Sequence, residues 1–526
     1  MKQKIISNTI MFIMILLFVV FFQGVFGEAN KMVGIVILII GLVISEKDLT
    51  QNLRLLIVGL LIVNILMGIL SYVSLLNPWI GLVLNFGFIF YVTYFNVAGN
   101  KKPYHFSFIL GYLFLTLASP PTLEEVPGRI IALIAGTFMI VGLQWLFNRK
   151  VYEKTLQSEV DNVLDSLHQR ITRIFSKDFS EHPEEVATLE VGMKRFMKVT
   201  HERRSFKTNL TEESMYRVTE IITLEKIYHL LSEIGQDYAK GNLSEDFLND
   251  VNQLIKELRK GSLSIATVLM KKWNQEDLPP SALKLKEAVR VLEGAEKHVY
   301  PVHQVGILKQ IFKDVDKDSL AYKFALRLAI LLAGSMFIQD LFNLEYGRWL
   351  CFTILALVQP GFEDSNKKTM HRVIGTTLGV ILFIILFSIF KTPTQQTLVV
   401  LFSSYIGMYM NRYDLKMVAV TVQSLGAALI GTTGAIIIGN RVFMVMLGAV
   451  VAYLGNKYLF TIRERDARKH YEELYDSYKK HLLIEREEYP HSSIVDTYHI
   501  LEVGELDEYY CEWLDISFDA LAKNIL

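Results

Sequence analysis

The sequence Phe21-Phe22-Gln23-Gly24-Val25-Phe26 closes an apolar stretch and returns in similar form as Phe337-Ile338-Gln339-Asp340-Leu341-Phe342. The two glutamines are 316 residues apart. The same spacing aligns two further pairs, Asp48 with Asp364 and Gly59 with Gly375. A spacing that recurs at separate points indicates that one hydrophobic unit occurs twice along the chain.

Two slightly shorter spacings extend this alignment to the end of the unit. At 315 residues Tyr94-Phe95-Asn96 aligns with Tyr409-Met410-Asn411, and at 312 residues Arg129 and Gly136 align with Arg441 and Gly448. Residues 1–148 and 323–461 are therefore predicted to be two copies of one unit, in the same order and direction. Parallel repeats of membrane segments are an architecture of transporters.

Composition indicates that lipid surrounds these two units. Of the 526 residues, 51% are apolar and 12% aromatic. The 54 basic and 54 acidic side chains balance, which argues against a nucleic-acid partner, because phosphate binding needs a concentrated excess of Lys and Arg. The two cysteines, Cys351 and Cys511, lie in a predicted span and in the tail, so no disulfide framework is indicated.

Apolar segments predict six membrane helices in each unit. They lie near residues 8–26, 32–44, 55–76, 79–95, 106–119 and 130–147, and near 324–342, 349–360, 373–390, 397–410, 417–438 and 442–460. Several are shorter than the roughly 20 residues that a straight helix needs to cross the hydrocarbon. The predicted fold class is an all-α polytopic membrane protein with two parallel six-helix repeats and a cytosolic helical bundle.

The start of the chain also has the basic residues and apolar run of a secretory signal. No Ala-x-Ala cleavage site follows, and the run recurs as the segment that ends at Gln339. Retention as a membrane helix is therefore predicted.

Basic residues in the short loops predict the orientation, because cytoplasmic loops carry an excess of Lys and Arg. With the N-terminus inside, the inner loops hold Lys47, Arg54, Lys101, Lys102, Lys367, Lys368, Arg372, Arg412 and Lys416. Residues 149–322, whose apolar side chains recur at helical spacing, then form a cytosolic helical domain, and residues 462–526 a cytosolic helical tail. The predicted location is the bacterial cytoplasmic (inner) membrane, with both termini inside.

The sequence carries none of the common catalytic or metal-binding signatures. It has no His-Glu-x-x-His, Walker loop, Rossmann glycine pattern or Gly-x-Ser-x-Gly. We therefore expect no enzyme activity, no metal and no cofactor. Without a Walker loop, uphill transport would run on an ion gradient or the membrane potential.

The second unit carries a motif that starts at Trp349 and continues through Gln359-Pro360 to Arg372, Gly375-Thr376 and Gly379. This order and spacing resemble the fusaric acid resistance (FUSC) and aromatic acid exporter family, in which a Trp-led apolar segment and a Gln-Pro precede an Arg, a Gly-Thr and another Gly. Asn440-Arg441 with Gly448 is similar to the family's last-helix signature. The likeness is sharp over residues 348–379, whereas Gln359-Pro360 has no counterpart in the first unit.

The resemblance implies a membrane exporter or channel for organic anions, with aromatic carboxylates as the best-known class. The plant aluminium-activated malate transporters look like distant relatives that have one such unit. The expected partners are small organic anions and the lipid bilayer; a homo-oligomer such as a dimer is left open.

Four residues are predicted to bind the substrate: Gln359, Arg372, Gln339 and Gln23. Pro360 followed by Gly361 predicts a helix break, which frees backbone groups that membrane depth tolerates only beside protein or a water-filled cavity. Arg372 adds a permanent charge with planar donors that suit a carboxylate. The two glutamines close matching apolar segments of the two copies.

Structural interpretations of the same residues stand beside this hypothesis. Arg372 also suits a positive-inside anchor at a helix start, paired with Glu363 or Asp364. Gln359-Pro360 also suits a simple helix end, and Gln23 and Gln339 suit hydrogen bonds between helices. Gly375 and Gly379 favour a helix-packing surface over a ligand contact. For the whole chain, the alternative function is a membrane-embedded regulatory or envelope-maintenance protein that transports nothing and whose bundle binds a partner.

Overall fold

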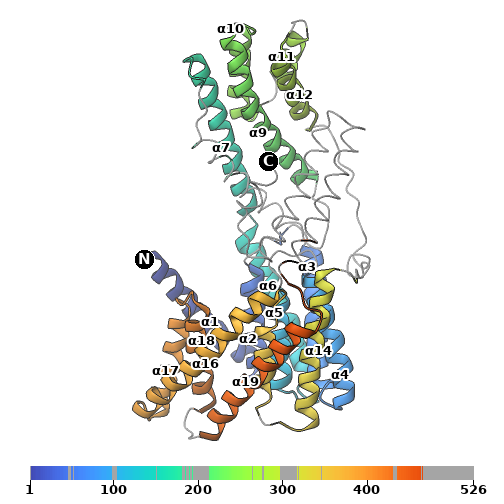
Figure 1. Ribbon diagram of the computed structural model, residues 1–526, viewed down its shortest axis with the longest axis vertical. Coiled ribbons are helices and arrows are strands. Elements are labelled where there is room, and N and C mark those ends of the chain that lie inside the picture. The colour runs from blue at the N-terminus through green and yellow to red at the C-terminus, as the bar shows by residue number, and fades with distance from the viewer. Residues whose placement is uncertain are drawn as a thin grey trace.

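The computed structural model describes residues 2–45, 49–50, 53–97, 104–149, 151–179, 212–262, 265–274, 278–295, 319–344, 346–429 and 435–463, with residues 184, 189, 192, 317, 465 and 469. Every regular element in these ranges is a helix. Apolar helices gather at one end of the long axis, and a group of more polar helices occupies the other end (Figure 1). The chain is an all-helical, multi-pass membrane protein.

The first unit contains six apolar helices in chain order. They are α1 (Lys2–Phe26), α2 (Lys31–Ser45), α3 (Leu53–Val73), α4 (Pro78–Val97), α5 (His105–Leu113) and α6 (Val126–Asn148). A short 3-10 turn, η1 (Glu28–Asn30), precedes α2. The π-helical turn η3 (Phe114–Ala118) extends α5.

The second unit also contains six. They are α14 (Leu320–Leu341), α15 (Arg348–Leu357), α16 (Phe362–Ile389), α17 (Pro393–Gly407), α18 (Tyr413–Leu429) and α19 (Ala435–Tyr458). The start of α17 shows why its sequence forms a helix there. Thr392 and Gln395 make a reciprocal capping box, and Pro393 occupies the first turn, where its missing N–H costs nothing.

Eight segments of the described residues are long and apolar enough to cross a membrane. They are Asn8–Phe26, Glu28–Ser45, Leu56–Val73, Pro78–Val97, Val126–Phe175, Leu320–Leu341, Ser365–Ile389 and Ile438–Tyr458. Two further apolar helices, His105–Ala118 and Arg348–Leu357, are shorter. Ten of the twelve helices of the two units thus coincide with these apolar segments, and the two six-span repeats stay a prediction.

The helices between the two units form a bundle with its own core. They are α7 (Val151–Phe175), α9 (Glu212–Ala239), α10 (Glu245–Arg259), α11 (Ala266–Trp273) and α12 (Pro280–Ala295). Buried side chains from all five helices make one hydrophobic cluster, and Trp273 is fully buried in it. The bundle's cytosolic location and the predicted boundaries at residues 149 and 322 stay predictions.

The two units share one membrane core, but only in part. The main hydrophobic cluster joins the first unit to α14, α15 and α19. Its closest interface is α4 against α14, where Trp79 lies 4.8 Å from Phe337 and Phe90 lies 5.4 Å from Tyr322, between ring centroids. Helices α16, α17 and α18 pack mainly on one another around a small separate cluster that includes Phe383 and Val422.

Gly375 and Gly379 form the predicted packing surface. A Cβ atom at Gly375 would lie 2.6 Å from Cβ of Met417, and one at Gly379 would lie 2.6 Å from Cβ of Thr421. Both neighbours belong to α18, so the two glycines let the α16 and α18 backbones approach closely. The packing interpretation of these glycines is confirmed.

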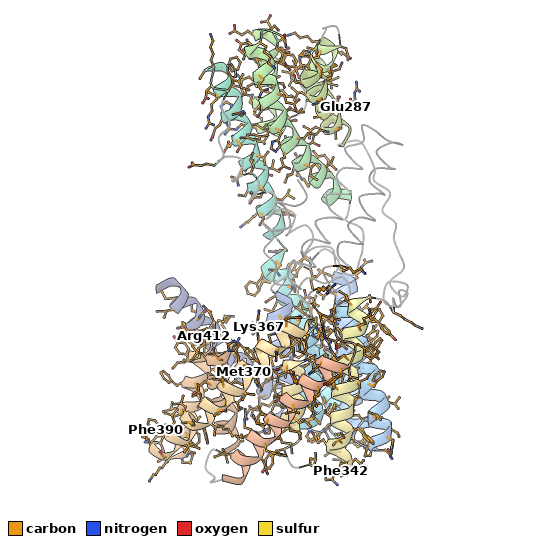
Figure 2. All side chains as sticks on the ribbon, viewed as in Figure 1. Glu287, Phe342, Lys367, Met370, Phe390 and Arg412 are labelled. Carbon is orange, nitrogen blue, oxygen red and sulfur yellow. The ribbon has the colours of Figure 1, made fainter. Side chains whose placement is uncertain are left out.

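The loops at the two ends of the membrane helices differ in character. Lys367 and Arg412 lie at the end that faces the bundle, whereas Phe342 and Phe390 lie at the opposite end (Figure 2). This arrangement puts basic loop residues and the bundle on the same side. Which side is the cytoplasm stays a prediction from the loop charges.

Candidate anion-binding site

Arg441 is the most unusual charged residue of the membrane helices. Its side chain is only 2% exposed. Its Nε and Nη1 atoms are buried without a hydrogen-bond partner among the described residues. The guanidinium lies over the ring of Trp349, 3.7 Å from the ring centroid. A buried guanidinium without an acceptor is costly, and contact with an aromatic face offsets only part of that cost.

The charged neighbours of Arg441 are also cations. Arg372 from α16 and Arg348 from the start of α15 are the two groups whose charge acts on it. The guanidinium of Arg348 lies 5.9 Å from the centroid of the Trp349 ring. No carboxylate of the described residues forms an ion pair with any of the three arginines. Three helices thus bring positive charge together without a balancing anion, which we call the arginine cluster (Arg348, Arg372 and Arg441).

Aromatic side chains border the arginine cluster on one side. The ring of Phe352 lies 5.9 Å from Trp349 and 5.1 Å from Phe114, between centroids. Phe114 belongs to η3 of the first unit, and the other two belong to α15 of the second. All three rings are half-buried. The cluster of charge therefore lies beside aromatic faces at the junction of the two units.

The predicted helix break lies at the other end of α15. Helix α15 ends at Leu357 and α16 begins at Phe362, with Gly361 as its N-cap. The break exposes the backbone carbonyls of Gln359 and Pro360, and one residue binds both: Nη2 of Arg327 donates to them at 2.6 and 2.7 Å. Arg327 is fully buried, and its Nη1 also donates to the carbonyl of Phe460 at 3.2 Å. The break is thus confirmed, and protein groups bind the carbonyls that it frees.

Further polar side chains form hydrogen bonds across the helix break. The hydroxyl of Ser365 donates to the carbonyl of Leu357 at 2.8 Å. Nδ2 of Asn456, from α19, donates to the same carbonyl at 3.3 Å and also to the Ser365 hydroxyl. These bonds fix the bundle-side ends of α15, α16 and α19 against one another, and so fix the backbones that carry Arg348, Arg372 and Arg441.

The four predicted site residues occupy different places. Arg372 reaches the arginine cluster; its Nη1 lies 2.6 Å from Sδ of Met417, and its buried Nε has no partner. Arg372 makes no ion pair with Glu363, and the side chain of Asp364 lies outside the described residues. Gln339 lies near the end of α14 and faces the start of α15, where its Oε1 is 3.9 Å from Sγ of Cys351.

Gln359 and Gln23 lie apart from the cluster. The Gln359 amide donates to the carbonyls of Ala356 and Val358, both at 3.2 Å, and its Oε1 accepts from Lys368 at 2.7 Å. Gln359 thus belongs to the helix break. Gln23 is half-buried on α1, and no side-chain hydrogen bond is found for it among the described residues. The substrate-binding role of all four residues stays a prediction.

Sequence reasoning missed Arg441, Arg348 and Trp349 as site residues. Arg441 is used there only to align the two copies and to match a family signature, and Trp349 only to open a motif. The recurrence of Arg129 as Arg441 was the available signal. The sequence gives no sign that Nε and Nη1 of Arg441 lack a partner among the described residues.

No group of three His, Cys, Asp or Glu side chains suited to a metal ion occurs among the described residues. The arrangement is instead suited to binding an anion. The arginines supply planar donors in a low-dielectric setting, where charge-assisted hydrogen bonds are strong. The neighbouring rings supply flat apolar contact.

Residues 332–455 match the protein family described as fusaric acid resistance protein-like, which confirms the family resemblance over these residues. The match supports a membrane protein of a transport family, and no catalytic family is indicated. Two uncharacterized bacterial proteins are similar over shorter stretches. One, "ORF2" of Neisseria gonorrhoeae, is 26% identical over 148 residues, 27% of this chain and 35% of that protein.

The other, from Haemophilus influenzae, is 27% identical over 155 residues, 28% of this chain and 21% of that protein. The chain thus aligns with about a third and a fifth of these two relatives. No solved structure matches the chain.

Proposed function

Because this chain carries a fusaric acid resistance protein-like region at residues 332–455, we propose that it exports or conducts organic anions across the membrane. The substrates are aromatic or other carboxylates, bound at the arginine cluster. The observation that carries the proposal is Arg441, a buried guanidinium without a hydrogen-bond partner among the described residues.

A carboxylate supplies what the arginine cluster lacks. It accepts two parallel hydrogen bonds from one guanidinium and offsets the repulsion among the three cations. Arg348 and Arg372 provide further donors from separate helices, so one anion links α15, α16 and α19. Because each cation comes from a different helix, anion binding depends on the relative positions of the three helices.

The rings beside the cluster favour a flat apolar group on the same substrate. Phe352 and Phe114 are half-buried; Phe352 lies between Phe114 and Trp349, whose face is occupied by Arg441. A planar aromatic ring attached to the carboxylate stacks against such side chains. This arrangement supports aromatic carboxylates over small dicarboxylates.

The membrane potential supplies a driving force without ATP. With the termini inside, an anion that leaves a negative interior moves down the electrical gradient, which is worth about 2.3 kcal/mol per charge for each 100 mV. This term alone favours export about fiftyfold at that potential, since 1.4 kcal/mol is a factor of ten. A channel and a carrier share this term and differ in kinetics.

The proposal is tested by flux. Purified protein in proteoliposomes should pass at least one acid from a panel of aromatic and dicarboxylic acids, driven by an imposed potential. Arg441→Gln keeps a polar side chain and removes the charge, so we expect flux to fall at least about tenfold, the effect of losing one charge-assisted hydrogen bond. Flux of no acid by the unaltered protein would favour the regulatory alternative.

Arg149 offers a matched control. Its guanidinium also lies over a tryptophan, 4.2 Å from the ring centroid of Trp145, but the side chain is exposed and lies at the end of α6. Arg149→Gln should leave flux unchanged at equal protein content. Equal losses in the two variants would show that loss of any Arg–Trp contact, and not the buried site, causes the effect.

A further inference from the structure

Helices α1 and α17 are far less buried than the other apolar helices. Phe22 is the one buried side chain among the described side chains of α1, and Gln396 is the one in α17. In the predicted repeat, α1 corresponds to α14 and α17 corresponds to α4. Those two counterparts pack on each other along most of their length, whereas α1 and α17 approach each other only locally. One interface of the predicted repeat is therefore complete and its counterpart is not.

The ends of α1 and α17 near the bundle do meet. The spacings of the repeat map the Phe90–Tyr322 contact of α4 and α14 onto Tyr405 and Ile6. At that place the Tyr405 hydroxyl lies 2.8 Å from Oγ1 of Thr9, and its ring lies 5.4 Å from the ring of Phe12. Helices α1 and α17 thus meet at their bundle-side ends, three to six residues further along α1 than the mapped position.

At the opposite ends, no ring contact between α1 and α17 is found among the described residues. Pro78-Trp79 at the start of α4 matches Pro393-Thr394 at the start of α17, so the Trp79–Phe337 contact maps onto Thr394 and Phe21. Phe21 is 54% exposed and Thr394 is exposed.

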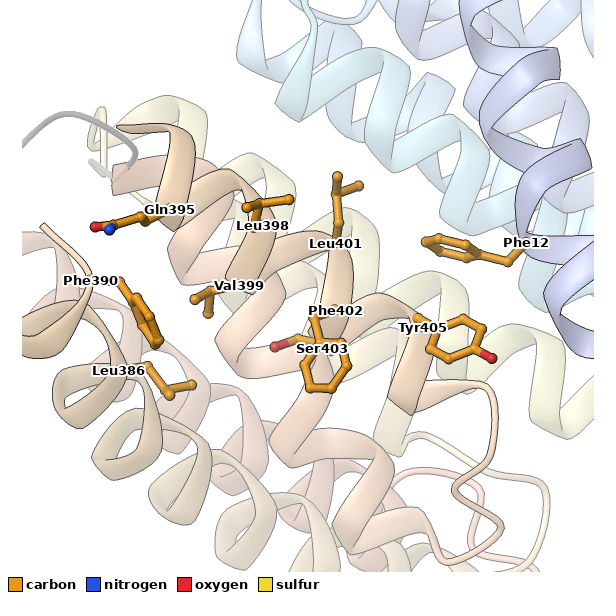
Figure 3. Close-up of a pocket in the computed structure, with 10 residues that line it drawn as sticks. All are labelled: Phe12, Leu386, Phe390, Gln395, Leu398, Val399, Leu401, Phe402, Ser403 and Tyr405. Carbon is orange, nitrogen blue, oxygen red and sulfur yellow. The ribbon is translucent and has the colours of Figure 1, made fainter. Parts of the chain in front are cut away.

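An apolar cavity of about 600 Å³ lies beside α17 at this level, with Phe12 as the one lining residue from α1. Phe12 and Gln395 lie at its opposite ends, and Leu398 and Leu401 of α17 point into the space between them (Figure 3).

We propose that α1 and α17 close on each other at the ends that carry Phe21 and Thr394, pivoting about the Thr9–Tyr405 contact. The closed form has the packing that α4 and α14 already show. Helices α16, α17 and α18 move together in this closure, because they share their own small core around Phe383 and Val422. The arginine cluster lies where this group meets α15 and α19, so closure changes access to it.

Membrane physics suits such a change. Apolar side chains of α1 and α17 already lie in hydrocarbon, so closure gains van der Waals packing but little from the hydrophobic effect. The open and closed forms therefore differ by a small free energy. A small difference allows both forms to be populated, and a bound anion to bias them.

Paired cysteines test the closure directly. In a background with Cys351 and Cys511 replaced by alanine, Phe21→Cys with Thr394→Cys should form a disulfide within one chain on mild oxidation in membranes. Both wild-type side chains are exposed, so the substitutions leave the cores intact. The matched control is Trp79→Cys with Phe337→Cys, which occupies the same place in the complete interface and should cross-link faster.

Gel mobility under non-reducing conditions reads the result without any flux measurement, so failure here is distinct from failure of the transport proposal. A cross-link within one chain supports the closure. If the control pair reacts and the Phe21/Thr394 pair does not, the proposal is wrong. A cross-link between two chains also overturns it, because a second copy would then cover the α1–α17 face.

Discussion

Arg129 and Arg441 occupy matching positions in the last helix of each predicted copy, but their surroundings differ. Both are almost completely buried. In the first unit, Nη1 of Arg129 donates to the carbonyl of Leu115 at 3.0 Å, and Nη2 donates to the Ser119 hydroxyl at 3.4 Å. In the second unit, Nε and Nη1 of Arg441 have no hydrogen-bond partner among the described residues, and the charged groups that act on it are cations.

The π-helical turn η3 explains the first environment. A π-turn shifts the backbone register, which leaves a carbonyl such as that of Leu115 free for a side chain. The neighbouring helix explains the second environment. Where α15 has Arg348 and Trp349, the spacing of 316 residues finds Met32 and Val33 in α2. Matching arginines thus differ in their bonding: Arg129 is bonded within its copy, whereas Arg441 lacks such partners among the described residues, as the proposed anion site requires.

The largest expected effect separates the two arginines by stability. Arg129→Leu removes the partner of a buried carbonyl and should destabilise the fold by about 3 kcal/mol, roughly a hundredfold in the unfolding equilibrium. Arg441→Leu removes a buried charge whose Nε and Nη1 have no partner in the part of the chain that the structure describes, so it should leave the melting temperature unchanged or raise it. Thermal unfolding in detergent measures both, and an equal loss of stability in the two variants would contradict the distinction.

A smaller effect is expected at Arg372, which has no arginine counterpart at the matching position of the first unit. If its planar donors bind a carboxylate, Arg372→Lys should keep insertion and stability but lower flux by about tenfold, because an ammonium loses two-point geometry. If Arg372 serves only as a positive-inside anchor, lysine should replace it without loss of flux. The decisive result is flux at equal surface expression: wild-type flux in the lysine variant would end the carboxylate role.

The smallest effect is expected at Trp349. Trp349→Phe keeps an aromatic face under Arg441 but weakens the cation–π attraction, which is strongest for tryptophan and amounts to about 0.5–2 kcal/mol. We expect the KM for an aromatic carboxylate to change about threefold with little change in stability. Val33→Ile, at the matching position in α2, should leave KM unaltered. A similar KM shift in that variant would show that the effect of Trp349→Phe does not depend on the contact with Arg441.

Local sequence patterns predicted those features that depend on neighbouring residues. Pro360-Gly361 predicted the helix break, because a proline cannot continue the hydrogen-bond ladder. Gly375 and Gly379, four residues apart, predicted a close helix contact, because the spacing puts both on one face. The sequence also predicted that the freed carbonyls lie beside protein or a water-filled cavity, but not that Arg327, which lies on a different helix, binds them.

The sequence did not predict features that depend on contacts between helices distant along the chain. Arg129 and Arg441 look alike along the chain, and only the packing of η3 and α15 around them makes one bonded and the other free. The short contact between α1 and α17 also has no local signal, because it depends on how two helices that lie far apart in the sequence pack. The motif alone singled out Arg372, but its prediction as a residue at a helix start is wrong, because α16 already begins at Phe362.

The ten residues of α15 also bear on how the protein enters the membrane. A helix of this length extends about 15 Å, half of the roughly 30 Å hydrocarbon thickness. It therefore lacks the apolar length to partition into lipid as an independent span. Its insertion has to be cooperative with α14, which brings Arg327 to the carbonyls at its end, and with α16, whose Ser365 binds the last turn. The segment from α14 to α16 is thus a single unit of membrane integration during biosynthesis.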